Sequence, residues 1–153
     1  MSNPPDLTLP QLRQFLQKGN LFIRYKGYTA SDDFFHKGDG TELGAGLHDG
    51  NLGEFEFKFI NGILTGKIFV NTDSGPRVAI SVGKDGTLCA CECDQGTNFS
   101  VGWNGKGHVI FTLHENKELY WTLVDERDRA KIVLMEWKGN HQQAWGFIPN
   151  VGN

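Results

Sequence analysis

The chain has 153 residues, enough for one domain with a substantial core but too few for two. The net charge is −3 with no block of like charges, so the composition favours neither a nucleic-acid-binding surface nor a basic membrane anchor. No apolar run reaches the roughly 18 residues of a membrane helix, and the first residues do not resemble a signal peptide. We therefore expect a cytoplasmic protein.

Residues 1–19 carry the helical signal of the chain. Thr8–Gln11 has a capping-box pattern, with a proline that the first turn of a helix tolerates. Leu12, Phe15 and Leu16 then fall on one helical face. The pattern predicts a short N-terminal helix that docks on the rest of the domain.

From residue 20 onward the sequence repeats at a step of 44 residues. Phe57–Phe59, Val101–Trp103 and Trp145–Phe147 each place two large residues on one face of a strand. Leu88–Cys91 precedes Ile132–Met135 by the same step. A fixed period of this length, with several short strands in each unit, indicates a repeated all-β fold. Three units are too few for a propeller and suit a threefold-symmetric trefoil.

Turn residues divide each repeat into four short strand-like stretches. The repeats span roughly residues 20–61, 62–104 and 105–150. The expected strands are Leu21–Lys26, Phe34–Lys37, Leu43–Leu47, Phe55–Phe59, Leu64–Val70, Val78–Val82, Leu88–Glu92, Phe99–Trp103, Val109–His114, Tyr120–Val124, Ile132–Trp137 and Ala144–Ile148. They predict an all-β fold, a single β-trefoil domain over residues 1–153, with six strands in a barrel and six in hairpins that close one end. An irregular sandwich is the alternative, but it gives no reason for a 44-residue period.

Large residues at equivalent positions of the repeats should meet in one core with pseudo-threefold symmetry. The residues expected there are Phe57, Phe59, Leu88, Val101, Trp103, Val133, Leu134, Trp145 and Phe147.

Three cysteines alternate along one expected strand. Cys89, Cys91 and Cys93 would therefore face the same side, which suits either a metal or redox site or small apolar filler. The 44-residue step aligns the first two with Val133 and Met135, which we expect in the core. Thiols along one strand also point in parallel and do not converge on a tetrahedron. We expect them to be reduced and without metal.

The remaining residues show no catalytic pattern. The five histidines lack metal-ligand spacing, and no Gly-x-Ser-x-Gly elbow is present. Glycines 38, 40, 44 and 46 resemble a phosphate-binding loop, but neither a helix nor a Lys-Ser/Thr pair follows them. These absences favour a binding protein that is not an enzyme and needs no cofactor. The histidines are His36, His48, His108, His114 and His141.

Gln143-Ala144-Trp145 resembles the Gln-x-Trp motif that closes each repeat of the ricin-B-type β-trefoil lectins. The other two repeats have Phe55–Phe57 and Phe99–Val101 in its place. The whole chain is also similar to the small lectin-like proteins of button-type mushrooms, which comprise the light subunit of mushroom tyrosinase and its mannose-binding relatives. Phe22–Gly27 and Glu118–Val124 carry that similarity.

The resemblance implies a non-catalytic, lectin-like protein, with mannose as a candidate ligand. It also implies an oxidase or tyrosinase subunit as a candidate partner. A protein–protein interaction module, either an accessory subunit or a loop-presenting protease inhibitor, is the alternative function. The fold alone does not decide between the two.

The ricin-type resemblance further implies a sugar site in the third repeat. Such a site combines an acid near the second strand, an aromatic platform at the end of the third, and an amide just before Gln-x-Trp. Here the acid is Asp125, the platform is Trp137, and the amide is Asn140 or Gln142. The acid and amides would bind sugar hydroxyls, and the indole would stack on the sugar ring.

One such site per chain is expected, because the other repeats lack both the acid and the aromatic residue at the equivalent positions. A purely structural role is the alternative. In that case Trp137 packs against the barrel and Asp125 pairs with Arg127 or Arg129 at the surface.

Overall fold

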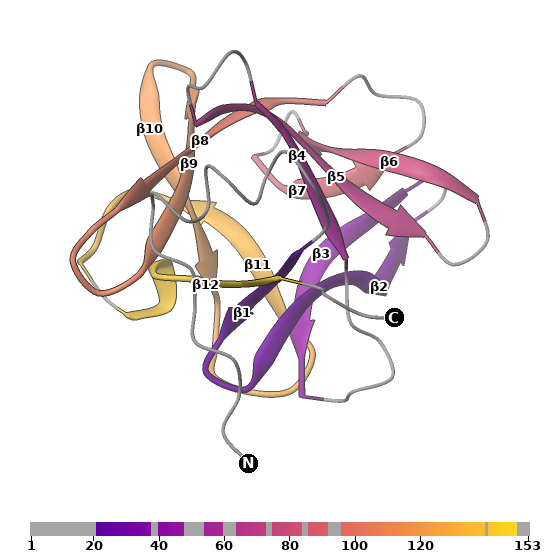
Figure 1. The fold of residues 1–153 in the computed structure, drawn as a ribbon, viewed down its shortest axis with the longest axis horizontal. Coiled ribbons are helices and arrows are strands. Elements are labelled where there is room, and N and C mark those ends of the chain that lie inside the picture. The colour runs from indigo at the N-terminus through magenta and orange to yellow at the C-terminus, as the bar shows by residue number, and fades with distance from the viewer. Residues whose placement is uncertain are drawn as a thin grey trace.

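The computed structural model describes residues 21–37, 40–47, 54–59, 64–72, 75–83, 86–91, 96–139 and 141–149. Each of the twelve expected strands is present (Figure 1). They are β1 (Leu21–Tyr25), β2 (Tyr28–Lys37), β3 (Gly40–Gly46), β4 (Phe55–Phe59), β5 (Thr65–Thr72), β6 (Gly75–Val82), β7 (Leu88–Cys91), β8 (Asn98–Trp103), β9 (His108–His114), β10 (Lys117–Leu123), β11 (Ala130–Met135) and β12 (Gly146–Pro149). A 3-10 turn, η2 (His141–Gln143), precedes β12.

The helix expected within residues 1–19 lies outside the described residues. Among the helices of the described part of the chain, none is long and apolar enough to cross a membrane.

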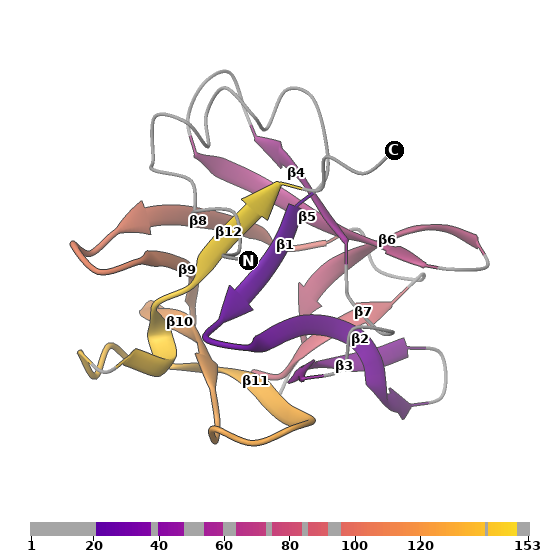
Figure 2. The same ribbon diagram turned by 60° about the horizontal axis from the view of Figure 1, so that its bottom comes forward.

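Six strands form a closed barrel. The antiparallel pairs β1–β4, β4–β5, β5–β8, β8–β9 and β1–β12 make up most of the ring. An isolated bridge between His108 and Trp145 closes it, with main-chain hydrogen bonds of 2.8 and 2.7 Å in the two directions. Figure 2 shows β1 and β12 side by side, so the first and third repeats are joined through main-chain pairing.

The other six strands form three hairpins at one end of the barrel. These hairpins are β2–β3, β6–β7 and β10–β11. They meet one another because β3 pairs with both β7 and β11. A six-stranded barrel capped by three joined hairpins is the β-trefoil that the repeat predicts.

The core lies inside the barrel, where strand alternation directs every second side chain. Trp145 and Trp121 are almost fully buried, and the indole N–H of Trp145 donates to the Trp121 carbonyl at 3.0 Å. Trp121 also meets the rings of Phe55 and Phe99 edge to face, with centroids 6.5 and 5.5 Å apart. Such contacts add to the roughly 1.5–3 kcal/mol gained by burying each large apolar side chain.

The 44-residue step is confirmed at one set of core positions. Phe57, Val101 and Trp145 are all buried, as the repeat requires. Of the other residues expected in the core, Leu88 and Phe147 are buried, whereas Phe59 and Leu134 are partly buried against it.

The expectation that Trp103 belongs to the core is wrong, because 49% of its surface is exposed. The imidazole of His108 lies between it and Phe147, with ring centroids 5.0 Å from Trp103 and 4.6 Å from Phe147. His108 thus fills the core position and leaves the indole at the end of β8.

The predicted facing of β7 is also wrong. Leu88 and Ala90 point into the core, so Cys89 lies on the opposite side, half-buried and not in a disulfide. Its equivalent, Val133, is likewise only half-buried. The core face of β7 is therefore offset by one residue from Cys89. The side chain of Cys91 and the whole of Cys93 lie outside the described part of the structure, and the expected metal-free state stays a prediction.

Candidate functional site

An aromatic row crosses the outer face of the third repeat. It consists of Phe111 on β9, Tyr120 on β10 and Trp137 just after β11. Phe111 and Tyr120 are paired in register, and their ring centroids lie 5.2 Å apart. Trp137 also contacts Tyr120, with ring centroids 5.2 Å apart. Because Trp121 faces the core, the alternation of the strand directs its neighbour Tyr120 outward. Trp137 is 47% exposed.

Polar groups surround the aromatic row. The Tyr120 hydroxyl donates a hydrogen bond to Glu118. Burial, reinforced by that carboxylate, raises the pKa of Tyr120 to about 12, so the phenol stays protonated at neutral pH. Lys117 and Glu136 form an exposed ion pair at 3.4 Å. The row therefore presents apolar rings next to hydrogen-bonding groups, which is the composition of a ligand surface.

Gln143 holds the chain on both sides of Trp137. Its side chain is buried, accepts from the Lys138 amide at 2.8 Å and donates to the Glu136 carbonyl at 2.7 Å. It also donates to the Thr122 hydroxyl at 3.2 Å. The first residue of the Gln-x-Trp motif thus holds the main chain around Trp137, a role that sequence reasoning did not assign to it.

The predicted acid, Asp125, lies in the connection between β10 and β11. Its carboxylate forms an ion pair with Arg127 at 3.5 Å, and both side chains are mostly exposed. This is the pairing that the structural alternative anticipated. Exposed pairs of this kind contribute little to stability, so a ligand hydroxyl can compete with Arg127.

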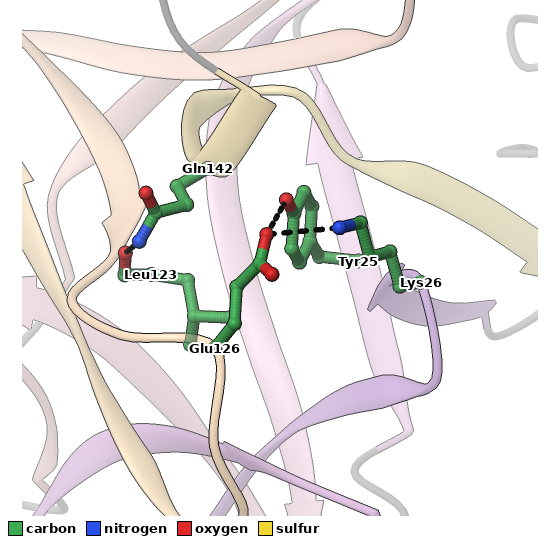
Figure 3. Close-up of polar contacts among 5 residues, drawn as sticks. All are labelled: Tyr25, Lys26, Leu123, Glu126 and Gln142. Carbon is green, nitrogen blue, oxygen red and sulfur yellow. Dashed lines mark hydrogen bonds and ion pairs between the residues drawn. The ribbon is translucent and has the colours of Figure 1, made fainter.

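The predicted amides are placed only in part. The Nε2 of Gln142 donates to the Leu123 carbonyl at 2.7 Å, two residues before Asp125 (Figure 3). Asn140 lies outside the described residues. Gln142 is thus tied to the strand that leads into the Asp125 turn, whereas Trp137 contacts Tyr120 instead. Their joint action on one sugar stays a prediction.

A second feature is a cleft between the first and third repeats that the sequence did not reveal. Its volume is about 230 Å³. The lining comes from the end of β1 and the β1–β2 turn, from the β8–β9 turn, and from Trp145 and the chain before and after it. Those residues are Arg24, Tyr25, Lys26, Asn104, Lys106, Gly107, Gly139, Ala144, Trp145 and Gly146. The polar lining residues of the β1 segment and of the β8–β9 turn are about 80 positions apart in the sequence, and no local motif links them.

The comparison with solved structures supports the fold. A crystal structure of a designed threefold-symmetric protein, ThreeFoil, superposes with a TM-score of 0.64 at 16% sequence identity. The match covers 86% of this chain and 99% of that one. No protein-family model and no curated protein matches the sequence. At this identity the similarity shows the fold alone, and it supports the β-trefoil.

Proposed function

We propose that the protein binds carbohydrate on the outer face of its third repeat and catalyses no reaction. The observation that carries the proposal is the half-exposed indole of Trp137, which rests on Tyr120 and whose flanking main chain is fixed by Gln143. A flat, pre-positioned aromatic ring suits the apolar face of a pyranose. A site that is already ordered also loses less conformational entropy on binding.

In this proposal the sugar hydroxyls are bound by the acid and the amides predicted from the sequence of the same repeat. Asp125 accepts hydroxyl hydrogen bonds in this proposal, and the amides of Gln142 and Asn140 donate or accept them. Among the described residues the Oε1 of Gln142 has no partner, whereas its Nε2 is used by Leu123. Mannose is the candidate ligand that the sequence resemblance supplies.

Removal of the platform and the acid tests the proposal. Binding to mannose-agarose and to a glycan array is measured for the wild-type protein, Trp137→Ala and Asp125→Ala. Each variant should bind at least about tenfold more weakly, which corresponds to a loss of about 1.4 kcal/mol. Their thermal midpoints should stay nearly unchanged, because Trp137 is half-exposed and the side chain of Asp125 is mostly exposed.

Trp103→Ala is the matched control, since its indole is 49% exposed against 47% for Trp137. It should keep wild-type glycan binding. Wild-type binding by both Trp137→Ala and Asp125→Ala would place the site elsewhere, and a wild-type protein that binds no glycan would remove the proposed function.

An accessory role beside an oxidase or tyrosinase subunit is the second candidate. Leu113 is 73% exposed on β9 and shares the outward face of Phe111. An apolar residue so exposed beside an aromatic row suits a protein interface. Leu113→Asp should abolish co-purification with such a subunit and leave mannose binding intact, whereas an unaltered complex would argue against this surface.

A further inference from the structure

We propose that the cleft between the β1–β2 and β8–β9 turns is a second binding site, and that it takes the carboxylate or sulfate group of an acidic saccharide. Only the saccharide part of this assignment rests on the proposed function. The anionic part follows from the groups that line the cleft.

The cleft is lined by cations from two separate segments, the end of β1 with the turn after it and the β8–β9 turn. Arg24 and Lys26 come from the first repeat, and Lys106 comes from the β8–β9 turn. Within the described part of the chain, neither Arg24 nor Lys106 has an ion-pair partner. Like charges brought together without a counter-charge repel each other, and a bound anion removes that repulsion.

Lys26 already has an acidic partner outside the cleft lining. Glu126 accepts from its ammonium group at 3.0 Å and also from the Tyr25 hydroxyl (Figure 3). The side chain of Glu126 is thus directed to the β1–β2 turn and does not neutralise Arg24 or Lys106. Lys26 is consequently the weakest of the three candidates for ligand binding.

Asn104 adds an oriented donor. Its Oδ1 accepts from the main-chain amides of Lys106 and Gly107, at 2.9 and 2.8 Å. With the oxygen held by the turn, the NH₂ group is the part of the side chain left for a ligand. Arg24, Lys106 and Asn104 therefore offer only donors, and an oxyanion is the ligand that such a set matches.

The size of the cleft limits the ligand. Its volume of about 230 Å³ lies below the roughly 300–1,000 Å³ of pockets for drug-sized molecules, and it is open on one side. Gly107 keeps the turn close to the third repeat, since a Cβ there would lie 3.1 Å from that of Ala144. Such a cleft accommodates one charged sugar unit, with the rest of a chain in solvent.

The experiment titrates the full-length protein with glucuronate, glucose 6-sulfate, glucose and inorganic sulfate, monitored by calorimetry at low and high salt. Glucuronate or glucose 6-sulfate should bind more tightly than glucose, and the affinity should fall as salt increases. Arg24→Gln and Lys106→Gln should each weaken that binding at least about tenfold, while Lys58→Gln, an equal charge change on β4, should leave it unchanged. The two charged sugars distinguish a carboxylate from a sulfate source.

Wild-type affinity in both cleft variants would overturn the site. Inorganic sulfate binding as tightly as the charged sugars would overturn the saccharide assignment. The two proposals fail separately: Trp137→Ala should still bind the charged sugar, and Arg24→Gln should still bind mannose-agarose. Because Lys106 is exposed, its variant remains informative even if Arg24→Gln lowers stability.

Discussion

The inner and outer sides of the third repeat each carry a tryptophan, but one side chain is buried and the other is half-exposed. On the inner side, Trp145 is buried and its indole N–H is satisfied by the Trp121 carbonyl. On the outer side, Trp137 is half-exposed and touches Tyr120. Gln143 joins the two, because it is buried beside the core yet bonds the chain around Trp137. The rigidity of the candidate platform thus depends on the core beneath it.

The largest test of this contrast replaces each tryptophan. Trp145→Ala should lower the free energy of unfolding by about 3–5 kcal/mol, as loss of a large core aromatic does, while Trp137→Ala should lower it by less than about 1 kcal/mol. Urea denaturation followed by circular dichroism measures both. Equal losses in the two variants would show that the inner and outer sides are not distinct in stability.

The buried side chain of His108, the residue whose main chain closes the barrel, should make the stability of the fold depend on pH. Burial lowers the pKa of His108 to about 4, and its ring nitrogens have no hydrogen-bond partner among the described residues. In the unfolded state the pKa of this histidine is near 6.5. Between about pH 4 and 6.5 the unfolded state therefore binds a proton that the folded state does not bind. Stability is therefore fully present above about pH 6.5 and falls by about 2–3 kcal/mol as the pH drops to about 4.

Urea unfolding at several pH values measures this loss, and His108→Phe isolates it from the titration of carboxylates. The phenylalanine keeps an aromatic ring against Phe147 and removes the proton-binding group. The slope between about pH 4 and 6.5 should be smaller in His108→Phe than in the wild type. Identical slopes would show that His108 does not titrate differently in the folded state.

The neighbouring glutamines provide a smaller, closely matched comparison. Gln143→Ala should cost about 2 kcal/mol, because it leaves the Glu136 carbonyl and the Lys138 amide without their partner. Gln142→Ala removes a single hydrogen bond from a half-buried side chain and should cost about 1 kcal/mol. Thermal unfolding of the pair measures the difference. Gln143→Ala should also weaken mannose binding. Unaltered binding would show that the position of Trp137 does not depend on the hydrogen bonds of Gln143.

The fold was predictable because the 44-residue period and the alternation of large residues along each strand can both be seen in the sequence. The step that relates Phe57, Val101 and Trp145 is visible without coordinates, and all three are buried. Trp103 and Cys89 were misplaced for a different reason. A histidine from the next strand occupies the space that Trp103 would need, and a one-residue shift of the core face turns Cys89 away.

The candidate sites were less accessible to sequence reasoning. Trp137 could be proposed from its position before Gln-x-Trp, but its contact with Tyr120 depends on the pairing of β10 with β11. The cleft unites Arg24 with Lys106 only because the barrel closes β1 against β12 and brings β9 to Trp145. Charges so far apart in sequence carry no spacing that predicts their meeting.

The smallest predicted effect concerns two tyrosines that each donate to a carboxylate, Tyr25 to Glu126 and Tyr120 to Glu118. Burial raises the pKa of Tyr25, and the hydrogen bond and negative charge of Glu126 raise it further. Glu126→Gln removes that charge, so the pKa of Tyr25 should fall while the pKa of Tyr120 stays unchanged; Glu118→Gln should do the reverse. NMR titration of the tyrosine ring signals distinguishes the two phenols.

Because Glu126 links the β10–β11 connection to the β1–β2 turn at a largely exposed contact, Glu126→Gln should leave the thermal midpoint nearly unchanged. A shift of the pKa of both tyrosines in either variant would mean that the Tyr25–Glu126 and Tyr120–Glu118 pairs are coupled.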